Sequence, residues 1–372
     1  MNSRERVIRA LNEGLVDRTP IDLGTTNCTT VTKKAYEALK KKLGIEKETR
    51  IMQENFQVVF IDEEVLDILK IDTRGIHPQP TFQKTVIDEK NYFNQFGTKL
   101  KMAETGLYYD IVEFPLSGKS FEEIKEFKWP DPKDSMDLTG VREKARKLKE
   151  DNKYFLVADA IDVGIFENCW FVRGFEDFLM DLIINTDIAN YLLENVLKYE
   201  LGRYELFLKE VCEYVDMVFV GDDLAGLENT FMRIETYRNV VKPYHKEFFS
   251  KLKQMTNNAK LMFHCCGTVS SLIPDLVEIG VDVLNPVQTA AKGMQVELLR
   301  DKYGKDICFW GGIDTIKILP HGSTEEVRQE VRRVIDVLGP VGYVLTAVHD
   351  IQPDVPPENV LAMYDEAVNY KR

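Results

Sequence analysis

The chain has 372 residues, of which 44% are hydrophobic and 29% charged, as in globular proteins with a sizeable core. Its formal net charge of −13 argues against nucleic acid and anionic membranes as main partners, because phosphate groups repel an acidic surface. The sequence shows no membrane-spanning apolar stretch and no signal-peptide core, and its six scattered cysteines form no disulfide framework. We therefore expect a cytoplasmic protein.

The first part of the chain combines helical and extended segments. Residues 1–17 have the spacing of a short amphipathic helix. RTPIDLG, at 18–24, predicts a first strand, and 31–43 predicts the helix that follows it. Residues 91–118 alternate between apolar and polar side chains and contain glycine turns. This pattern predicts an antiparallel excursion around residues 75–130.

From about residue 150 onward, short apolar runs alternate with segments of helical period. The runs are nearly continuous in apolar residues, as expected for parallel strands covered on both faces. They span residues 154–160, 215–223, 261–266, 281–286, 307–314 and 342–350. The segments predicted as helices are 137–150, 175–184, 187–211, 235–254, 269–279, 323–338 and 356–370. Such alternation predicts an α/β fold.

Each predicted strand ends in a cluster of polar, cysteine or glycine residues. In a (β/α)8 barrel these ends converge on one mouth, where the chemistry takes place. An open, doubly wound sheet also binds ligands at strand ends, but no GxGxxG or P-loop motif follows any of these strands. We therefore predict a single (β/α)8 TIM-barrel domain over residues 1–372, with an N-terminal helical extension.

The stretch LMFHCCGTV, at 261–269, contains one histidine and two cysteines. Because alternate residues of a strand face the same side, His264 and Cys266 are predicted to point together, and Cys265 away from them. Nitrogen and sulfur ligands suit zinc, and His349, at the end of the last predicted strand, is the best third ligand. Three protein ligands leave an open position, as in catalytic zinc sites. The alternative is a buried cysteine pair behind a core strand.

Other residues near the strand ends are candidates for catalysis or binding. Asp222 and Asp223 end one strand and are predicted to act as a general acid, a substrate contact or the partner of a ligand histidine. The alternative for this pair is a helix cap. The candidates for substrate binding are Glu167, Trp170, Arg173, Asn285, Gln288 and Asp314. For these, a role in a loop, in the core or in capping is the alternative. Cys28 is an additional candidate thiol at the mouth.

Several segments carry a resemblance to a known family. FHCCGTVSSLIPDLVEIGVDVLNPVQ, FWGGID, VLTAVHDIQPDVPPENVLAMYDEA, FENCWFVRGFEDFLMDL and SRERVIRALNEGLVDRTPIDLG resemble the uroporphyrinogen decarboxylase superfamily, and more closely its branch of cobalamin-dependent methyltransferases. The resemblance implies a TIM barrel. Decarboxylases of this superfamily carry an arginine-rich segment after the first strand, but no arginine lies between Arg18 and Arg50 here. A polyanionic tetrapyrrole would then lack guanidinium partners, which disfavours the decarboxylase.

The resemblance to the methyltransferase branch implies a zinc site of the form His-x-Cys plus a later cysteine. His264 and Cys266 match the first two positions, and His349 stands where relatives have the later cysteine. The implied reaction moves a methyl group between a small methoxylated or N-methylated substrate, or a thiol, and the cobalt of a corrinoid (cobalamin). The chain has no corrinoid-binding motif, so we expect a separate small corrinoid protein as the partner.

Two other readings of the sequence stay open. The first is a metal-free enzyme that passes methyl from a methylcorrinoid to tetrahydrofolate, with acidic residues such as Asp222 and Asp223 against the pterin. The second, less favoured, is uroporphyrinogen decarboxylation. Relatives are often dimers, so a homodimer is one expectation for the assembly.

Overall fold

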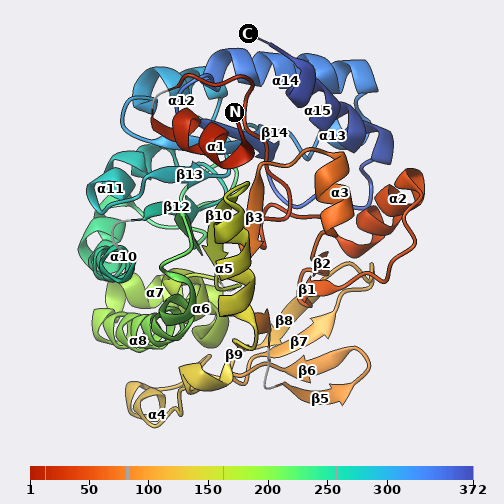
Figure 1. Ribbon diagram of the computed structural model, residues 1–372. Coiled ribbons are helices and arrows are strands. Elements are labelled where there is room, and N and C mark those ends of the chain that lie inside the picture. Colours follow the sequence, from red (N-terminus) through yellow and green to blue (C-terminus); the bar gives the residue numbers. More distant parts are fainter. Residues whose placement is uncertain (13, 81–83, 162, 257–258, 372) are drawn as a thin grey trace.

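The computed structural model describes residues 1–12, 14–80, 84–161, 163–256 and 259–371. Its centre is a seven-stranded parallel sheet that curls into most of a barrel (Figure 1). Neighbouring strands follow the order β15-β14-β13-β12-β11-β10-β3. The strands are β3 (Thr73–Ile76), β10 (Phe155–Asp159), β11 (Met217–Gly221), β12 (Lys260–His264), β13 (Val283–Asn285), β14 (Cys308–Ile313) and β15 (Tyr343–Ala347). The predicted α/β barrel is confirmed.

Ile21 takes the eighth position, between the two edge strands of the sheet. It forms a parallel bridge with Leu345 of β15, and its carbonyl accepts the amide of Asp72, just before β3. The amide of Ile21 donates to the Asp72 side chain at 3.0 Å instead of to a backbone carbonyl. Pro20 has no N–H to extend the ladder. For these reasons the predicted strand at 18–24 is reduced to a single bridge.

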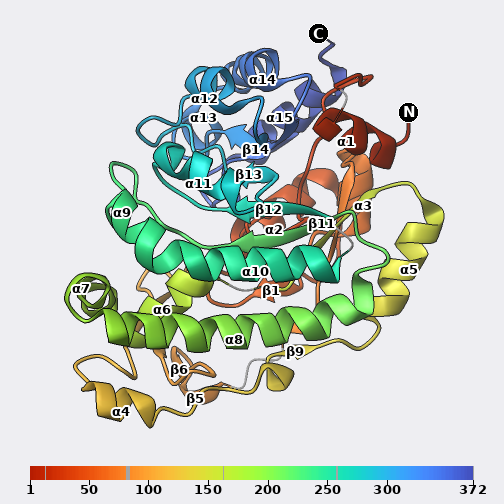
Figure 2. The same ribbon diagram turned by 90° about the vertical axis from the view of Figure 1, so that its left-hand side faces the viewer.

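Helices cover the outside of the sheet, and α8 and α10 lie side by side (Figure 2). They are α2 (Lys33–Leu43), α3 (Glu63–Ile68), α5 (Val141–Asp151), α6 (Ile165–Arg173), α7 (Phe175–Ile184), α8 (Thr186–Val211), α9 (Ile234–Thr236), α10 (Lys242–Met255), α11 (Ile273–Glu278), α12 (Val296–Tyr303), α13 (Ile318–His321), α14 (Thr324–Leu338) and α15 (Pro357–Asn369). A π-helical segment, Tyr237–Val241, joins α9 to α10. A 3-10 turn, Ser270–Leu272, precedes α11. Within the described part of the chain, no helix has the length and apolar character needed to cross a membrane.

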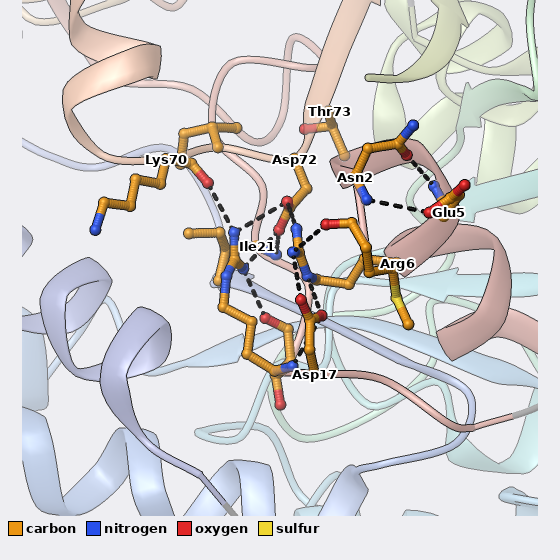
Figure 3. A network of polar contacts seen from close by, with 12 residues as sticks. Asn2, Glu5, Arg6, Asp17, Ile21, Lys70, Asp72 and Thr73 are labelled. Atoms are coloured by element: carbon orange, nitrogen blue, oxygen red, sulfur yellow. Dashed lines mark hydrogen bonds and ion pairs between the residues drawn. The ribbon is translucent and has the colours of Figure 1, made fainter. Parts of the chain in front are cut away.

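The helix α1 (Ser3–Asn12) closes the N-terminal end of the barrel. Its Val7 and Leu11 pack against residues inside the barrel, such as Phe155 and Met217. An ion-pair network fastens it to the same end of the sheet (Figure 3). The buried Asp72 carboxylate pairs with Arg6 at 2.5 Å and with Arg18 at 2.7 Å, and Arg6 also pairs with Asp17 at 2.7 Å. The N-terminal helical extension is therefore part of the barrel's packing.

The predicted antiparallel excursion forms a separate four-stranded sheet at the other end, at the bottom of Figure 1. Its strands are β5 (Thr85–Asp88), β6 (Asn91–Phe93), β7 (Lys99–Met102) and β8 (Tyr109–Glu113). The amide of Tyr109 donates to the carbonyl of Asn55, and Thr98 Oγ1 donates to the carbonyl of Phe171. The smaller elements nearby are β1 (Ile51–Gln53), β2 (Val58–Val59), β4 (Gln79–Pro80), α4 (Phe121–Lys125), the 3-10 turn Pro132–Asp134 and β9 (Met136–Asp137). The excursion is thus held against the carboxyl-terminal mouth of the barrel.

Candidate metal centre and substrate cavity

A cavity of about 470 Å³ lies between the barrel mouth and the four-stranded sheet. The barrel side is formed by residues that follow the parallel strands: Asn27, Cys28, Val163, Glu167, Trp170, Phe171, Gly221, Asp223, His264, His349 and Asp350. The other walls come from the β1–β2 hairpin and from the excursion: Gln53, Asn55, Phe56, Asn94, Leu100, Tyr108, Tyr109, Asp110, Ile111 and Phe114. Three parts of the chain that are distant in sequence therefore enclose one site.

His264, the last residue of β12, is held in one tautomer. Its Nδ1 lies 2.6 Å from Asn285 Oδ1, while Asn285 Nδ2 donates to the carbonyl of Trp310 at 3.0 Å. Because the amide nitrogen of Asn285 is used toward Trp310, its oxygen faces Nδ1, and Nδ1 of His264 carries the proton. Burial lowers the pKa of His264 to about 3, so the ring is neutral and Nε2 keeps its lone pair.

Cys266 follows β12 by two residues and turns to the same side as His264. Its Sγ lies 3.4 Å from His264 Nε2. Two tetrahedral zinc ligands at about 2.1 Å (nitrogen) and about 2.3 Å (sulfur) are roughly 3.6 Å apart, close to this separation. The amide of Cys266 donates to Asp223 Oδ1 at 2.7 Å, which holds the loop in place. Burial raises the pKa of the Cys266 thiol well above its ordinary value.

His349, which follows β15, lies beside His264 in the wall of the cavity. The two ring centroids are 5.2 Å apart, in an edge-to-face arrangement. His349 Nδ1 lies 2.8 Å from the amide of Asp350 and 3.3 Å from its carboxylate. Burial opposes protonation of His349, but the charges of Asp350 and Asp223 outweigh it and raise the pKa of the ring. Metal binding at this ring would therefore compete with its protonation.

Two groups of three side chains in the described part of the chain place their ligand atoms within 4.8 Å of one another. The first group is Cys28, His264 and His349, and the second is Asp223, His264 and Cys266. Both contain His264, but Cys266 and His349 fall in different groups. The predicted ligand set therefore does not form a single compact group. Cys266 and His349 each lie near His264, but in different groups. Nitrogen, sulfur and carboxylate donors of this kind fit zinc.

Asp222 does not line the cavity, and its catalytic role stays a prediction. Its carboxylate accepts the amides of Phe166 at 2.7 Å and Glu167 at 2.9 Å, at the start of α6. It also lies 2.8 Å from Nε2 of His245, whose Nδ1 in turn faces the hydroxyl of Tyr237 at 3.2 Å. Asp222 is only 1% exposed. It therefore caps the N-terminus of α6. The sequence offered a helix cap as the alternative for this residue, but α6 comes from an earlier part of the chain and does not follow Asp222.

Asp223, Glu167 and Trp170 line the cavity, where the sequence predicted them to be. Glu167 Oε2 accepts the amide of Asp223 at 2.9 Å. This bond holds the two acidic residues next to each other in the cavity wall. Burial raises the pKa of Asp223. The indole N–H of Trp170 is buried and has no hydrogen-bond partner among the described residues.

Four other residues predicted to bind substrate contact other parts of the protein, and none of them lines the cavity. Arg173 is buried, and its Nε donates to Asp181 at 2.8 Å. Asn285 orients His264, as described above. Gln288 Oε1 accepts the amide of Gly267, and Asp314 Oδ1 accepts the amides of Ile316 and Lys317. Spacing along the chain placed these residues near the mouth, but it does not reveal which way a side chain turns.

No sequence pattern singles out the excursion and hairpin side chains that enclose the cavity. Tyr109, Ile111 and Phe114 are among them. Their only signal is the alternating pattern of 91–118, which identifies strands but not what the strands cover. The charge of the cavity was also not foreseen. Asp110, Glu167, Asp223 and Asp350 contribute four carboxylates, and no lysine or arginine occurs among its described lining residues.

Comparison with known proteins places these features in context. A family model described as uroporphyrinogen decarboxylase (URO-D) matches residues 92–370. A methylated-thiol–coenzyme M methyltransferase of Methanosarcina mazei is 26% identical over 127 residues, which are 33% of this chain and 31% of that protein. A uroporphyrinogen decarboxylase of Gloeobacter violaceus is 22% identical over 165 residues, or 44% of each chain. The chain thus spans less than half the length of these relatives.

A solved structure described as a methyltransferase from Methanosarcina mazei has the same fold. The TM-score is 0.69 over 99% of this chain and 98% of that one, at 15% sequence identity. At that identity the likeness establishes the shared barrel and nothing about the reaction.

Proposed function

This chain belongs to the uroporphyrinogen decarboxylase family, and we propose that within it the protein is a zinc-dependent methyltransferase. It moves a methyl group between a small methylated substrate, or a thiol, in the mouth cavity and the cobalt of a corrinoid carried by a separate small protein. One observation carries the proposal. Neutral His264 directs the lone pair of Nε2 toward the thiol of Cys266, at a separation that suits two ligands of one zinc ion.

The residues in and next to the cavity would have different roles. His264, Cys266 and His349 would hold zinc, and Asn285 and Asp223 keep the first two in position. When bound, zinc supplies a Lewis acid that lowers the pKa of a thiol or polarises the heteroatom of a methylated substrate. The aromatic walls, Trp170 among them, would exclude water and pack against the substrate.

The charge of the cavity supports this proposal over its alternatives. A porphyrinogen carries several carboxylates, and a folate carries a glutamate tail. Neither would find a lysine or arginine among the described residues of the lining, and both would face its four carboxylates. An uncharged or cationic methylated compound meets no such repulsion. The cavity therefore favours methoxylated or N-methylated compounds. The tetrahydrofolate enzyme is the second candidate, because Asp223 and Glu167 are acids that could contact a pterin.

Elemental analysis and a transfer assay test the proposal together. The purified protein is expected to hold about one zinc per chain and to exchange methyl groups with a methylated corrinoid protein, and Cys266→Ala is expected to lose both. Cys212→Ala, on the far side of the molecule in α8's C-terminal turn, is the control and should retain both. Transfer that persists after zinc is stripped would refute the metal's role. Absence of zinc together with stabilisation by tetrahydrofolate would support the folate enzyme instead.

A further inference from the structure

We propose that Cys28 is a second thiolate ligand of the metal, on the His349 side of His264. The inference rests on the proposed function, since it requires a zinc-binding site at this mouth. The sulfur of Cys28 and ring nitrogens of His264 and His349 lie within 4.8 Å of one another. All three side chains line the cavity, whereas Cys266 does not appear in its lining. The thiol that faces the substrate space is therefore Cys28.

The loop that carries Cys28 is fixed at both ends. On one side, the amide of Asn27 donates to Asp159, at the end of β10, at 2.7 Å. On the other, the amide of Thr30 donates to Asp350 at 3.0 Å, and the amide of Ile351 donates to the carbonyl of Thr30 at 3.0 Å. Val31 also forms a parallel bridge with Ile351. These bonds hold the loop beside the end of β15, so the approach of Cys28 to His349 is built into the barrel's closure.

The surroundings of the thiol also point to a ligand. Two imidazoles lie at coordinating range of the sulfur. No lysine or arginine occurs in the described lining, so a metal cation is the group that could balance a thiolate at this position. On coordination, the thiol proton passes to solvent.

The consequence is a site with two thiolates, one on each side of His264. Cys266 lies 3.4 Å from Nε2, and Cys28 belongs to the group that includes His349. Cys28, from the chain segment beside the end of β15, would add a second sulfur to that of Cys266. With His264 and His349 the two thiolates complete four protein ligands, so a substrate would reach the metal by expanding it to five-coordinate or by displacing one ligand.

Alkylation of the unmodified protein tests the assignment without any substitution. Iodoacetamide is expected to label Cys28 in the chelator-treated protein and to label it at least about tenfold more slowly with one equivalent of zinc, as peptide mapping would show. Cys308, at the opposite end of the barrel, is the internal control, because zinc should not alter its labelling. Equal labelling of Cys28 in both states, in protein that binds zinc, overturns this inference and leaves the proposed function standing. Absence of zinc binding overturns both.

Cobalt substitution counts the thiolates independently. The sulfur-to-Co(II) charge-transfer absorption in the near ultraviolet should correspond to two thiolates in the wild type. It should fall by about half in Cys28→Ser and in Cys266→Ser, and remain unchanged in Cys308→Ser. Zinc affinity of Cys28→Ser should fall by more than the roughly 10–100-fold that loss of an outer-shell partner costs. A Cys28→Ser protein with the full absorption and wild-type zinc affinity would refute the assignment.

Discussion

The hydrogen bonds of Asn285 determine what the neighbouring histidine can do. Asn285 donates to the Trp310 carbonyl and accepts from Nδ1 of His264, so the lone pair of the ring is at Nε2. Sequence reasoning found Asn285 at the strand end but interpreted it as a substrate contact. Its side chain does not line the cavity. It acts through His264, whose tautomer it determines. No spacing rule reveals this, because a tautomer depends on hydrogen bonds between different strands.

Replacing Asn285 by alanine is expected to weaken zinc binding by roughly 10–100-fold, since His264 loses the partner that fixes its orientation. Competition with a coloured chelator measures the affinity. Asn359→Ala is a matched control, because Asn359 is also buried and its amide donates to the carbonyls of Leu319 and Gly322, far from the cavity. Both variants should lose about 1–3 kcal/mol of stability. Equal zinc affinity in the two variants would contradict the role assigned to Asn285.

Asp222→Ala is expected to destabilise the protein without removing the metal. The substitution removes the cap of α6 and leaves the buried Nε2 of His245 without its partner, for a combined cost of about 2–4 kcal/mol. Urea unfolding measures the loss, and elemental analysis of the folded protein should still find zinc. A variant of unchanged stability that has lost methyl transfer would support the catalytic role that the sequence predicts for Asp222.

Among the secondary-structure elements, those with continuous apolar runs were predicted well. Strands β10 to β15 and helices such as α8 and α14 lie where the sequence placed them. Other elements were missed, and β3 and α6 show the physical reasons. In β3, Thr73 bonds to Asp22 and Arg74 stacks on Tyr154 at 3.6 Å, so polar side chains occupy a buried strand. In α6, apolar residues face several directions, and no 3.6-residue period stands out.

The strand β8 gives the excursion its part in the cavity. Ile111 lines the cavity, and the next residue, Val112, is exposed on the other face of the strand. Ile111→Ala is therefore expected to raise KM for an uncharged methylated substrate by about 5–50-fold through lost apolar contact, and to leave zinc content unchanged. Val112→Ala is the neighbouring control, with KM within about twofold of the wild type. Similar KM values for the two variants would remove the excursion from substrate binding.

In the molecule as a whole, chemistry and stability are found at opposite ends of the barrel. The ligand groups and the cavity lie at the carboxyl ends of the strands, under the excursion. At the amino ends, α1 and its ion pairs hold the edge strand β3 and the bridge at Ile21 together (Figure 3). The family's barrel geometry could be read from the sequence, but this closure could not, since it depends on one buried carboxylate serving two guanidinium groups and an amide.

Asp72→Asn is expected to cost about 3–5 kcal/mol of unfolding free energy, because it leaves Arg6 and Arg18 facing a neutral group in a buried site. The control is Asp17→Asn, which removes the other partner of Arg6. The Asp17 side chain is 45% exposed, whereas that of Asp72 is 0% exposed. Solvent screens such a pair, and its loss should cost less than about 1 kcal/mol. Urea unfolding compares the stability of the two variants. Their zinc content reports on the metal site at the opposite end of the barrel. Zinc binding should be equal in both folded proteins, and a comparable loss of stability in the two would show that burial of Asp72 is not what closes the barrel.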